Sequence, residues 1–269
     1  MSGDEIILNH YEKTAKLWGL GPRSSIQDPQ IRETEIEFIL GEVFEVLKRS
    51  QNKELKVLEL GCGNGHLLEK LAINFPQLKL YGIEFTPELF ELTRSRELPR
   101  TQVLCADARD TSTFSQFGEE FDIIITERVI INLLSWDDQH QALVNIANLL
   151  KPKGRYIMVE SFRESWLLMN EARKEMGLAR VEQSSHNRFL NEKVTVALSK
   201  LSLLELKGQM PYNSLSTHFY LTRVLHPSVR PYGGKTKESH FVSFFKAALP
   251  PNVGNYSPIQ LRVFEKSTR

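Results

Sequence analysis

The sequence predicts an α/β protein built on a doubly wound parallel sheet. Short apolar runs alternate along the chain with segments in which apolar residues recur every three or four positions, the patterns of strands and helices. The apolar runs are continuous, which is typical of strands covered by helices on both faces. A glycine-rich turn joins the first run to the next helical segment. This order of elements favours a parallel sheet with crossover helices.

The individual elements follow from these two periodicities. Residues 31–47 carry an apolar stripe with charged residues elsewhere, so an amphipathic helix precedes the sheet. Thr86 is a good N-cap for the helix after the second strand, and a turn at residues 151–154 leads into the fifth. The strands are expected at residues 56–60, 79–84, 101–106, 121–126, 155–160, 203–207 and 259–266. The helices between them are expected at residues 66–74, 87–96, 139–150, 164–176 and 191–200.

A long connection separates the last two strands. It spans residues 208–257 and is rich in aromatic residues, histidine, proline and glycine. Connections of this length in a compact domain are usually functional or disordered. The aromatic residues favour an ordered segment, so we expect an insert that binds the acceptor substrate.

Charge is divided unevenly along the chain. The net charge is only +1, but residues 1–150 contain about 15 Lys and Arg against about 24 Asp and Glu, whereas residues 151–269 contain about 19 against about 9. The second part is therefore basic. A basic surface is either an ordinary solvated face or a binding surface for an anionic ligand, and both interpretations stay open.

The composition also restricts the class of protein. An apolar fraction of 41% is enough for a substantial core and disfavours a disordered chain. Two cysteines, Cys62 and Cys105, make no disulfide framework, so a reducing compartment is expected. There is no signal-peptide pattern at the start of the sequence and no apolar run of membrane-spanning length. We therefore expect a cytoplasmic protein with no membrane partner.

A glycine-rich motif, ELGCGNG, occupies residues 59–65 between the first strand and the first helix after it. Glycine lets the chain turn sharply and lets a ligand approach the backbone, and the helix N-terminus presents free amides. Dinucleotide oxidoreductases use a G-x-G-x-x-G spacing. Here the glycines alternate as G-x-G-x-G, and an acid, Glu59, stands two residues before the first.

This acid and this spacing resemble the first motif of class I S-adenosylmethionine-dependent methyltransferases. The resemblance continues from about Val57 to Glu160. It implies a Rossmann-like seven-stranded sheet with helices on both faces, N-terminal helices and an insert before the last strand. It divides one compact domain into an N-terminal helical cap (1–50), a cofactor-binding core (51–160) and the remainder of the sheet with the insert (161–269).

The resemblance also implies contacts to S-adenosylmethionine. Glu84 ends the second strand, where an acid holds the two ribose hydroxyls, and Asp107 ends the third, where family members accept from the adenine amino group. Glu127 follows the fourth strand, near the methionine end or the acceptor. Tyr11 lies in a helix that would close over the site, and it is either a contact to the cofactor's carboxylate or a core tyrosine. The expected cofactor-binding residues are Tyr11, Glu59, Gly61, Gly63, Gly65, Glu84, Asp107, Ala108 and Glu127.

The chemistry of the acceptor leaves two possibilities. A hydroxyl needs a base to remove its proton, and His186, His218 and His226 are the candidates, with His186 first. A satisfied structural histidine is the more common explanation for each of them. A carboxylate needs no base, and arginines would orient it through paired hydrogen bonds. The expected catalytic residues are therefore His186, Glu127 and Arg128. The expected acceptor-binding residues are Arg188, His218, Arg223, His226 and Arg230. No metal is expected.

Within the family, the chain looks most like small-molecule O-methyltransferases of biosynthetic pathways. The expected reaction methylates a hydroxyl or carboxylate of a small-molecule or peptide-like product and leaves S-adenosylhomocysteine. The segment after Glu127 departs from the Asn-Pro-Pro-Tyr motif, which disfavours amino groups of exposed bases or glutamine as acceptors. The alternatives are a noncatalytic methyltransferase-like binding protein, a nicotinamide-dependent oxidoreductase and an RNA-directed methyltransferase. The last rests on basic and aromatic residues between Tyr212 and Tyr232, but the sequence pI of about 7.8 opposes it.

Overall fold

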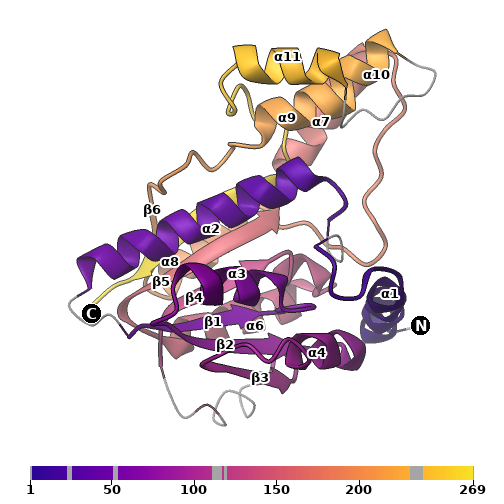
Figure 1. Cartoon of the computed structure of the whole chain (residues 1–269). Coiled ribbons are helices and arrows are strands. Elements are labelled where there is room, and N and C mark those ends of the chain that lie inside the picture. Colours follow the sequence, from indigo (N-terminus) through magenta and orange to yellow (C-terminus); the bar gives the residue numbers. More distant parts are fainter. Residues whose placement is uncertain are drawn as a thin grey trace.

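The structure is a computed structural model, and it describes residues 2–22, 26–50, 54–110, 117, 120–230 and 239–268. In this part of the chain seven strands form one sheet (Figure 1). They are β1 (Lys56–Leu60), β2 (Lys79–Glu84), β3 (Thr101–Cys105), β4 (Phe121–Glu127), β5 (Leu150–Ser161), β6 (Leu203–Leu206) and β7 (Ile259–Lys266). Every strand that the sequence predicts is therefore present.

The strand order is β3-β2-β1-β4-β5-β7-β6. The ladders from β3 to β5 are parallel, as expected, but β7 runs antiparallel to both β5 and β6. The turn predicted at residues 151–154 is not a separate connection, because β5 already begins at Leu150. Instead the β4–β5 register shifts between Phe121 and Ile123, and Lys153 has a φ of 64°. Between the register pairs of Phe121 and Ile123, β4 advances two residues and β5 five, so residues 151–154 form an irregular insertion at the start of β5.

The helices begin and end close to the predicted residues. They are α1 (Gly3–Trp18), α2 (Pro29–Arg49), α3 (His66–Asn74), α4 (Pro87–Arg94), α6 (Trp136–Leu149), α7 (Arg163–Glu175) and α8 (Lys193–Lys200), with a short 3-10 turn η1 (Ile130–Asn132) after β4. Three of these N-termini have side-chain caps: Ser2 and Glu5 form a capping box on α1, Asp28 caps α2, and Ser135 caps α6.

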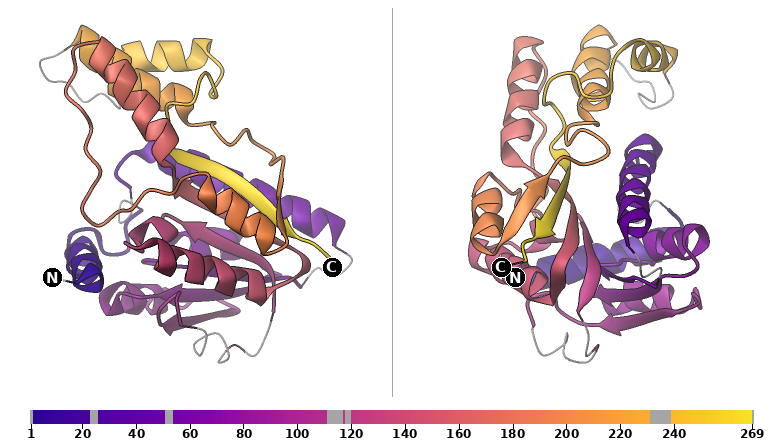
Figure 2. Two further views of the ribbon diagram at one scale, coloured as in Figure 1. Left: turned by 180° about the vertical axis from the view of Figure 1, so that it is seen from behind. Right: turned by 90° about the vertical axis from the view of Figure 1, so that its left-hand side faces the viewer.

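Alternation of side chains along the strands divides the core into two halves. Val57 and Ile125 point towards α2 and α3, whereas Leu58 and Ile124 point towards α6 and α8. Figure 2 shows these helix pairs on opposite sides of the sheet. Because side chains two residues apart share a face, Glu59 and Glu127 lie on the α2 side at the carboxyl ends of β1 and β4.

The insert is helical. It contains α9 (Ser216–Tyr220), a π-helical turn η2 (Leu221–Leu225), α10 (His226–Val229) and α11 (His240–Ala248). Together with α7 these helices lie beyond the N-terminal end of α2, whereas α1 packs against α4 at the edge where the parallel strands end (Figure 1). Residues 231–238, including Tyr232, lie outside the described residues.

Candidate active site

A cleft opens at the carboxyl ends of the parallel strands. The chain leaves β1 towards β2 on one side and reaches β4 on the other, and open α/β sheets bind ligands at such a switch point. The cleft encloses about 800 Å³, counting its open mouth. Its described lining consists of Asp4, Ile7, Tyr11, Gly61, Gly63, Ile83, Glu84, Phe85, Thr86, Leu89, Ala106, Asp107, Ala108, Arg109, Glu127, Arg128, Val129, Asn132 and Leu133.

Two glycines of the ELGCGNG motif form one wall of the cleft. Gly61 has a φ of 66°, and a Cβ at this position would lie only 2.4 Å from Val129. Gly63 has a φ of 57°, and a Cβ there would meet no atom within 4 Å, because it would project into open space. The first glycine therefore permits close packing and the second leaves room for a ligand against the backbone.

Glu84 joins the end of β2 to this loop. Its Oε2 accepts a hydrogen bond from the Gly63 amide at 2.8 Å, and its Oε1 accepts one from the Thr86 amide at 2.8 Å. Burial raises the pKa of the Glu84 carboxyl, and these amides oppose that rise. A carboxylate has about four lone-pair positions, so two remain to accept from hydroxyls of a ligand in the cleft.

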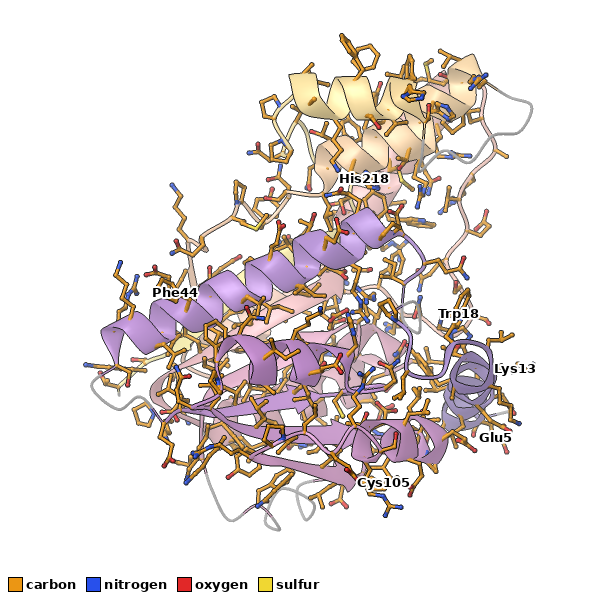
Figure 3. The ribbon with its side chains drawn as sticks, viewed as in Figure 1. Glu5, Lys13, Trp18, Phe44, Cys105 and His218 are labelled. Carbon is orange, nitrogen blue, oxygen red and sulfur yellow. The ribbon has the colours of Figure 1, made fainter. Side chains whose placement is uncertain are left out.

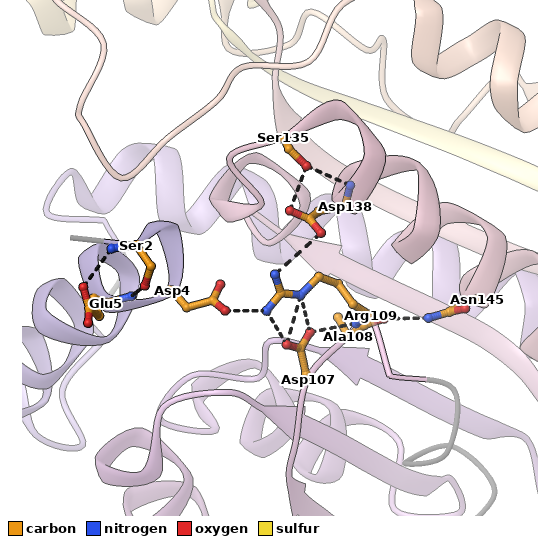
Figure 4. Close-up of polar contacts among 9 residues, drawn as sticks. All are labelled: Ser2, Asp4, Glu5, Asp107, Ala108, Arg109, Ser135, Asp138 and Asn145. Carbon is orange, nitrogen blue, oxygen red and sulfur yellow. Dashed lines mark hydrogen bonds and ion pairs between the residues drawn. The ribbon is translucent and has the colours of Figure 1, made fainter.

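Asp107 lies across the cleft and is held by Arg109, a residue that the sequence analysis missed (Figure 4). Asp107 Oδ1 accepts from the Arg109 amide at 2.8 Å, and both carboxylate oxygens lie 3.0 Å from Arg109 Nε. The same guanidinium donates to Asp4 of α1 at 2.9 Å and lies 3.6 Å from Asp138 of α6. Arg109 thus fixes the orientation of Asp107 and ties α1 to the rim of the cleft.

Tyr11 reaches the cleft from α1. Asn132 Nδ2 donates to Tyr11 Oη at 2.7 Å and to the carbonyl oxygen of Arg128 at 3.0 Å. Burial is the main cause that raises the pKa of Tyr11 to about 12. The phenol therefore stays protonated at neutral pH.

Glu160, at the end of β5, holds the η1 turn that carries Asn132. Its carboxylate oxygens accept from the amides of Val129 (2.9 Å), Ile130 (3.0 Å) and Ile131 (3.3 Å). Burial raises the pKa of Glu160 to about 7, despite these three donors. A glutamate at the end of a strand gives no sign of this role in the sequence, because its partners are backbone amides about thirty residues earlier.

The raised pKa of Glu160 predicts that the stability of the protein depends on pH. The pKa of Glu160 is higher in the folded state than in the unfolded state, so the native protein binds a proton on Glu160 more tightly. The contribution of Glu160 to stability is therefore lost as pH rises from about 4.5 to about 7. We expect the unfolding free energy of wild type relative to Glu160→Gln to fall by up to about 3 kcal/mol between pH 4.5 and 8. Urea unfolding at several pH values measures this difference. A constant difference would show that Glu160 has an ordinary pKa.

A buried group of four charges lies beside the cleft. Arg32 and Glu35 of α2 meet Glu127 and Arg128 at the end of β4: Arg32 binds Glu127, and Arg128 binds both glutamates. All four side chains are at most 10% exposed. Burial alone would raise the pKa of Glu127, but the two guanidinium groups outweigh it and hold the pKa below its usual range. Burial raises the pKa of the other glutamate, Glu35, to about 7. Glu127 is therefore the more acidic of the two and a poor base.

A smaller cavity lies on the α2 side of the glycine loop. It shares Gly61, Gly63 and Glu127 with the cleft and adds, among others, Glu59, Arg32 and His66. Glu59 Oε2 is buried and has no hydrogen-bond partner among the described residues. Burial also raises the pKa of Glu59 well above its usual value. The acid of the motif is thus buried beside the loop, with one oxygen that no described residue satisfies.

His186 lies beside the cleft but is not among its described lining residues. Its ring stacks on His10 of α1, with 3.6 Å between the ring centroids, and the two rings lie against Tyr11. Burial, followed by His10, lowers the pKa of His186 to about 4. The side chain is therefore neutral at pH 7 and a weak base.

The five expected acceptor-binding residues do not meet at the cleft. His218 Nε2 and Arg223 instead lie 3.2 Å and 3.5 Å from Asp28, the cap of α2. Figure 3 shows His218 next to the N-terminal end of α2. His226 is buried with its ring 5.9 Å from Phe241, and Arg188 and Arg230 are exposed. His218 and Arg223 therefore attach the insert to α2. Asp28 lies about 190 residues earlier in the sequence, so the sequence alone gives no sign of this contact.

Among the described residues, no group of three or more His, Cys, Asp or Glu residues is arranged to hold a metal ion. No helix in this part of the chain is long and apolar enough to cross a membrane. Cys62 and Cys105 are both free thiols.

Comparison with known proteins identifies the family. The model of a methyltransferase domain family matches residues 51–212, more than half of the chain. Two curated relatives are malonyl-[acyl-carrier protein] O-methyltransferases. The one from Priestia megaterium is 25% identical over 133 residues, or 47% of this chain and 46% of the relative. The one from Bacillus anthracis is 26% identical over 149 residues, or 53% and 52%. The chain thus spans about half the length of the curated relatives it matches.

A solved structure supports the fold. Magnesium protoporphyrin IX methyltransferase from Synechocystis PCC 6803, with bound S-adenosylmethionine, superposes with a TM-score of 0.57 at 12% identity, covering 99% of this chain and 98% of the other. The cleft fits this cofactor: Gly63 faces open space, Glu84 keeps lone pairs for hydroxyls of a ligand, and Asn132 Oδ1 lacks a partner among the described residues. The chain belongs to the methyltransferase domain family, it has the class I fold, and its cofactor is S-adenosylmethionine.

Proposed function

We propose that the protein is an O-methyltransferase whose acceptor is a carboxylate. Both curated relatives described above are named for O-methylation of a malonyl group, and a malonyl thioester carries one free carboxylate. The expected product is a methyl ester together with S-adenosylhomocysteine. The acceptor belongs to a small molecule or to an acyl or peptide group carried by another molecule.

The observation that carries this proposal is the absence of a suitable base. The described lining of the cleft contains no histidine, cysteine or lysine. Its acidic groups are held by donors: Glu84 by two amides, Asp4 and Asp107 by Arg109, and Glu127 by two arginines. A hydroxyl acceptor needs a group that removes its proton. A carboxylate is already ionised at neutral pH and has no proton to lose.

The chain's own residues then bind and align the reactants. When bound, S-adenosylmethionine supplies an electrophilic methyl group on its sulfonium. We propose that Glu84 accepts from the ribose hydroxyls, that Asp107 accepts from the adenine amino group, and that Gly61 and Gly63 let the cofactor lie against the loop. Of the expected arginines only Arg128 lines the cleft. It already binds Glu35 and Glu127, so we assign the orientation of the acceptor carboxylate to its remaining N–H groups. Positioning of this kind supplies much of the rate enhancement in displacement reactions.

The test uses S-adenosylmethionine labelled in its methyl group and three matched acceptor sets. Each set contains a carboxylic acid, its amide and the corresponding alcohol, with malonyl and succinyl thioesters among the acids. We expect label to enter the acids only and to be released as methanol by mild alkali, as a methyl ester requires. Alkali-stable label, or methylation of the alcohols, would contradict the proposal.

A second prediction distinguishes a carboxylate acceptor from a hydroxyl acceptor through a variant of the enzyme. Replacing His186 by alanine is expected to leave kcat within about threefold of wild type, since a carboxylate needs no base. Initial rates at saturating cofactor measure this. A loss of a hundredfold or more would make His186 the base of a hydroxyl acceptor.

The cytoplasmic location expected from the sequence stays a prediction.

A further inference from the structure

Helix α11 of the insert is apolar but largely uncovered. It contains three phenylalanines and one charged residue, Lys246, yet Val242 is its only buried residue. Helix α3 also has nine residues and buries four of them. A helix that is apolar on most of its sides is normally buried. The surface of α11 is therefore one that another body is expected to cover.

The three phenylalanine rings of α11 form one patch. The ring centroids of Phe241 and Phe245 are 4.8 Å apart, and those of Phe244 and Phe245 are 5.3 Å apart. Phe244 is 67% exposed, and the other two are half-buried. Further exposed apolar residues occur at the end of α10 and after α11; they are Val229, Leu249 and Val253.

The charge of the insert is almost entirely positive. Residues 208–257 contain five Lys and Arg against a single carboxylate, Glu238, which lies outside the described residues. Arg223 is paired with Asp28 of α2. Arg230 and Lys246 are exposed, and neither forms an ion pair with another described residue; the Lys246 ammonium donates to the neutral side chain of Gln30. Two uncompensated cations thus lie on the elements that carry the exposed apolar residues.

The patch lies at the outer edge of the insert. Helices α7 and α11 both pack against η2, and Figure 2 shows them on opposite sides of it, with α11 away from the sheet. The neighbouring helices α2 and α7 do carry exposed acids. The surface without carboxylates is therefore confined to α11 and the parts of the insert around it.

This distribution of charge favours a lipid surface over an acidic protein. A protein partner needs complementary charge only where its own charges lie. An anionic membrane presents a continuous negative potential that extends over about a Debye length, roughly 8–10 Å, so it disfavours carboxylates over the whole approaching surface. Phenylalanine with lysine or arginine is also typical of surfaces that enter the boundary between headgroups and acyl chains. Protein interfaces are anchored more often by tryptophan and tyrosine.

We propose that α11 docks the protein onto an anionic membrane surface. The Phe244 ring enters the headgroup region, and Arg230 and Lys246 lie against lipid phosphates. The sequence led us to expect no membrane partner, because it contains no run long enough to span a bilayer, but binding at the surface requires no such run. The proposal depends on neither the cofactor nor the acceptor.

Sedimentation of the whole chain with lipid vesicles at low ionic strength tests the proposal. The vesicles consist of phosphatidylcholine alone or of an equal mixture of phosphatidylcholine and phosphatidylglycerol. We expect binding to the mixed vesicles only, and we expect added salt to weaken it by screening the cations. Lys246→Gln should weaken binding about fivefold, the contribution of one cation near an anionic surface. Phe244→Ala should weaken it about tenfold through the lost burial of the ring.

Two variants outside the insert are the matched controls. Ile73→Ala removes a side chain of α3 that is 69% exposed, as much as Phe244. Lys200→Gln removes an exposed lysine from the last turn of α8, the position that Lys246 has in α11. Both should bind the mixed vesicles like wild type. Comparison of thermal unfolding shows that all four variants are folded.

Failure of the wild-type protein to sediment with the mixed vesicles would overturn the proposal. Equal binding to both kinds of vesicle, or equal losses in the variants and the controls, would overturn it as well. Binding to immobilised polyglutamate in place of vesicles would assign the surface to an acidic protein. A dimer in sedimentation velocity that Phe244→Asp dissociates would assign it to a second copy of the chain.

Discussion

Replacing Arg32 by methionine is expected to lower the free energy of unfolding by about 3–5 kcal/mol, the usual cost of removing one partner of a buried ion pair. Arg32 binds Glu127, and the side chains are 9% and 5% exposed. Without Arg32, the buried glutamates Glu35 and Glu127 share the single cation Arg128. The loss therefore comes from excess negative charge in the core, since methionine keeps most of the volume of the side chain.

Charge balance provides the control for this prediction. The double variant Arg32→Met/Glu127→Gln removes one charge of each sign, so it should regain most of the lost stability in urea unfolding. Arg155→Met breaks the comparably buried pair with Glu42, whose side chains are 5% and 1% exposed and absent from the cleft lining. It should lower stability without changing affinity for S-adenosylhomocysteine. A loss below about 1 kcal/mol for Arg32→Met, or no recovery in the double variant, would show that the four charges are not coupled.

Replacing Glu84 by alanine is expected to weaken binding of S-adenosylhomocysteine by about ten- to a hundredfold. A hydrogen bond to a charged acceptor contributes about 1.5–3 kcal/mol, and the proposed ribose contact would be lost. The change also removes the acceptor of the Gly63 and Thr86 amides, which position the glycine loop. The loss of the ribose contact and the loss of support for the glycine loop both weaken binding at the cofactor site.

The control for Glu84 is the same change at a nearby exposed position. Glu88→Ala, four residues later on α4, removes an exposed carboxylate outside the cleft lining and should leave the affinity unchanged. Calorimetry on both variants, after their thermal unfolding has been compared with wild type, makes the measurement. If Glu84→Ala binds the ligand like wild type while folded, Glu84 is not part of the cofactor site.

The strands and the glycine loop were predictable because each depends on residues close together in sequence. An apolar run sets a strand, and the end of a parallel strand sets the edge at which its next side chain lies. This is why Glu84, Asp107 and Glu127 were expected at one edge and are found in one cleft. The antiparallel direction of β7 was not predictable from the residues, because pairing with β5 and β6 is a long-range contact.

The residues expected to bind the acceptor were not predictable in this way, because their contacts are long-range. Charge and residue type suggested Arg223 and His218 as ligand-binding groups, but the fold pairs them with Asp28, about 190 residues earlier. Arg109, Asn132 and Glu160 were missed for the same reason. Each of the three also has a partner on a distant element: Asp4 for Arg109, Tyr11 for Asn132 and the amides around η1 for Glu160. In the sequence each therefore looks like an ordinary surface or strand-end residue.

The sequence by itself determined the α/β fold, the order of the strands along the chain, the glycine loop and the acids at the ends of β2, β3 and β4, since periodicity and strand ends are local properties. Only the tertiary structure decided which of these groups are paired and which stay available. Folding brought α2 against β4, so that Glu127 is neutralised by Arg32, and brought α1 against η1, so that Tyr11 and Asn132 meet. The physical reason is that burial makes an unpaired charge or polar group costly, and the partner that satisfies it comes from wherever the fold places one.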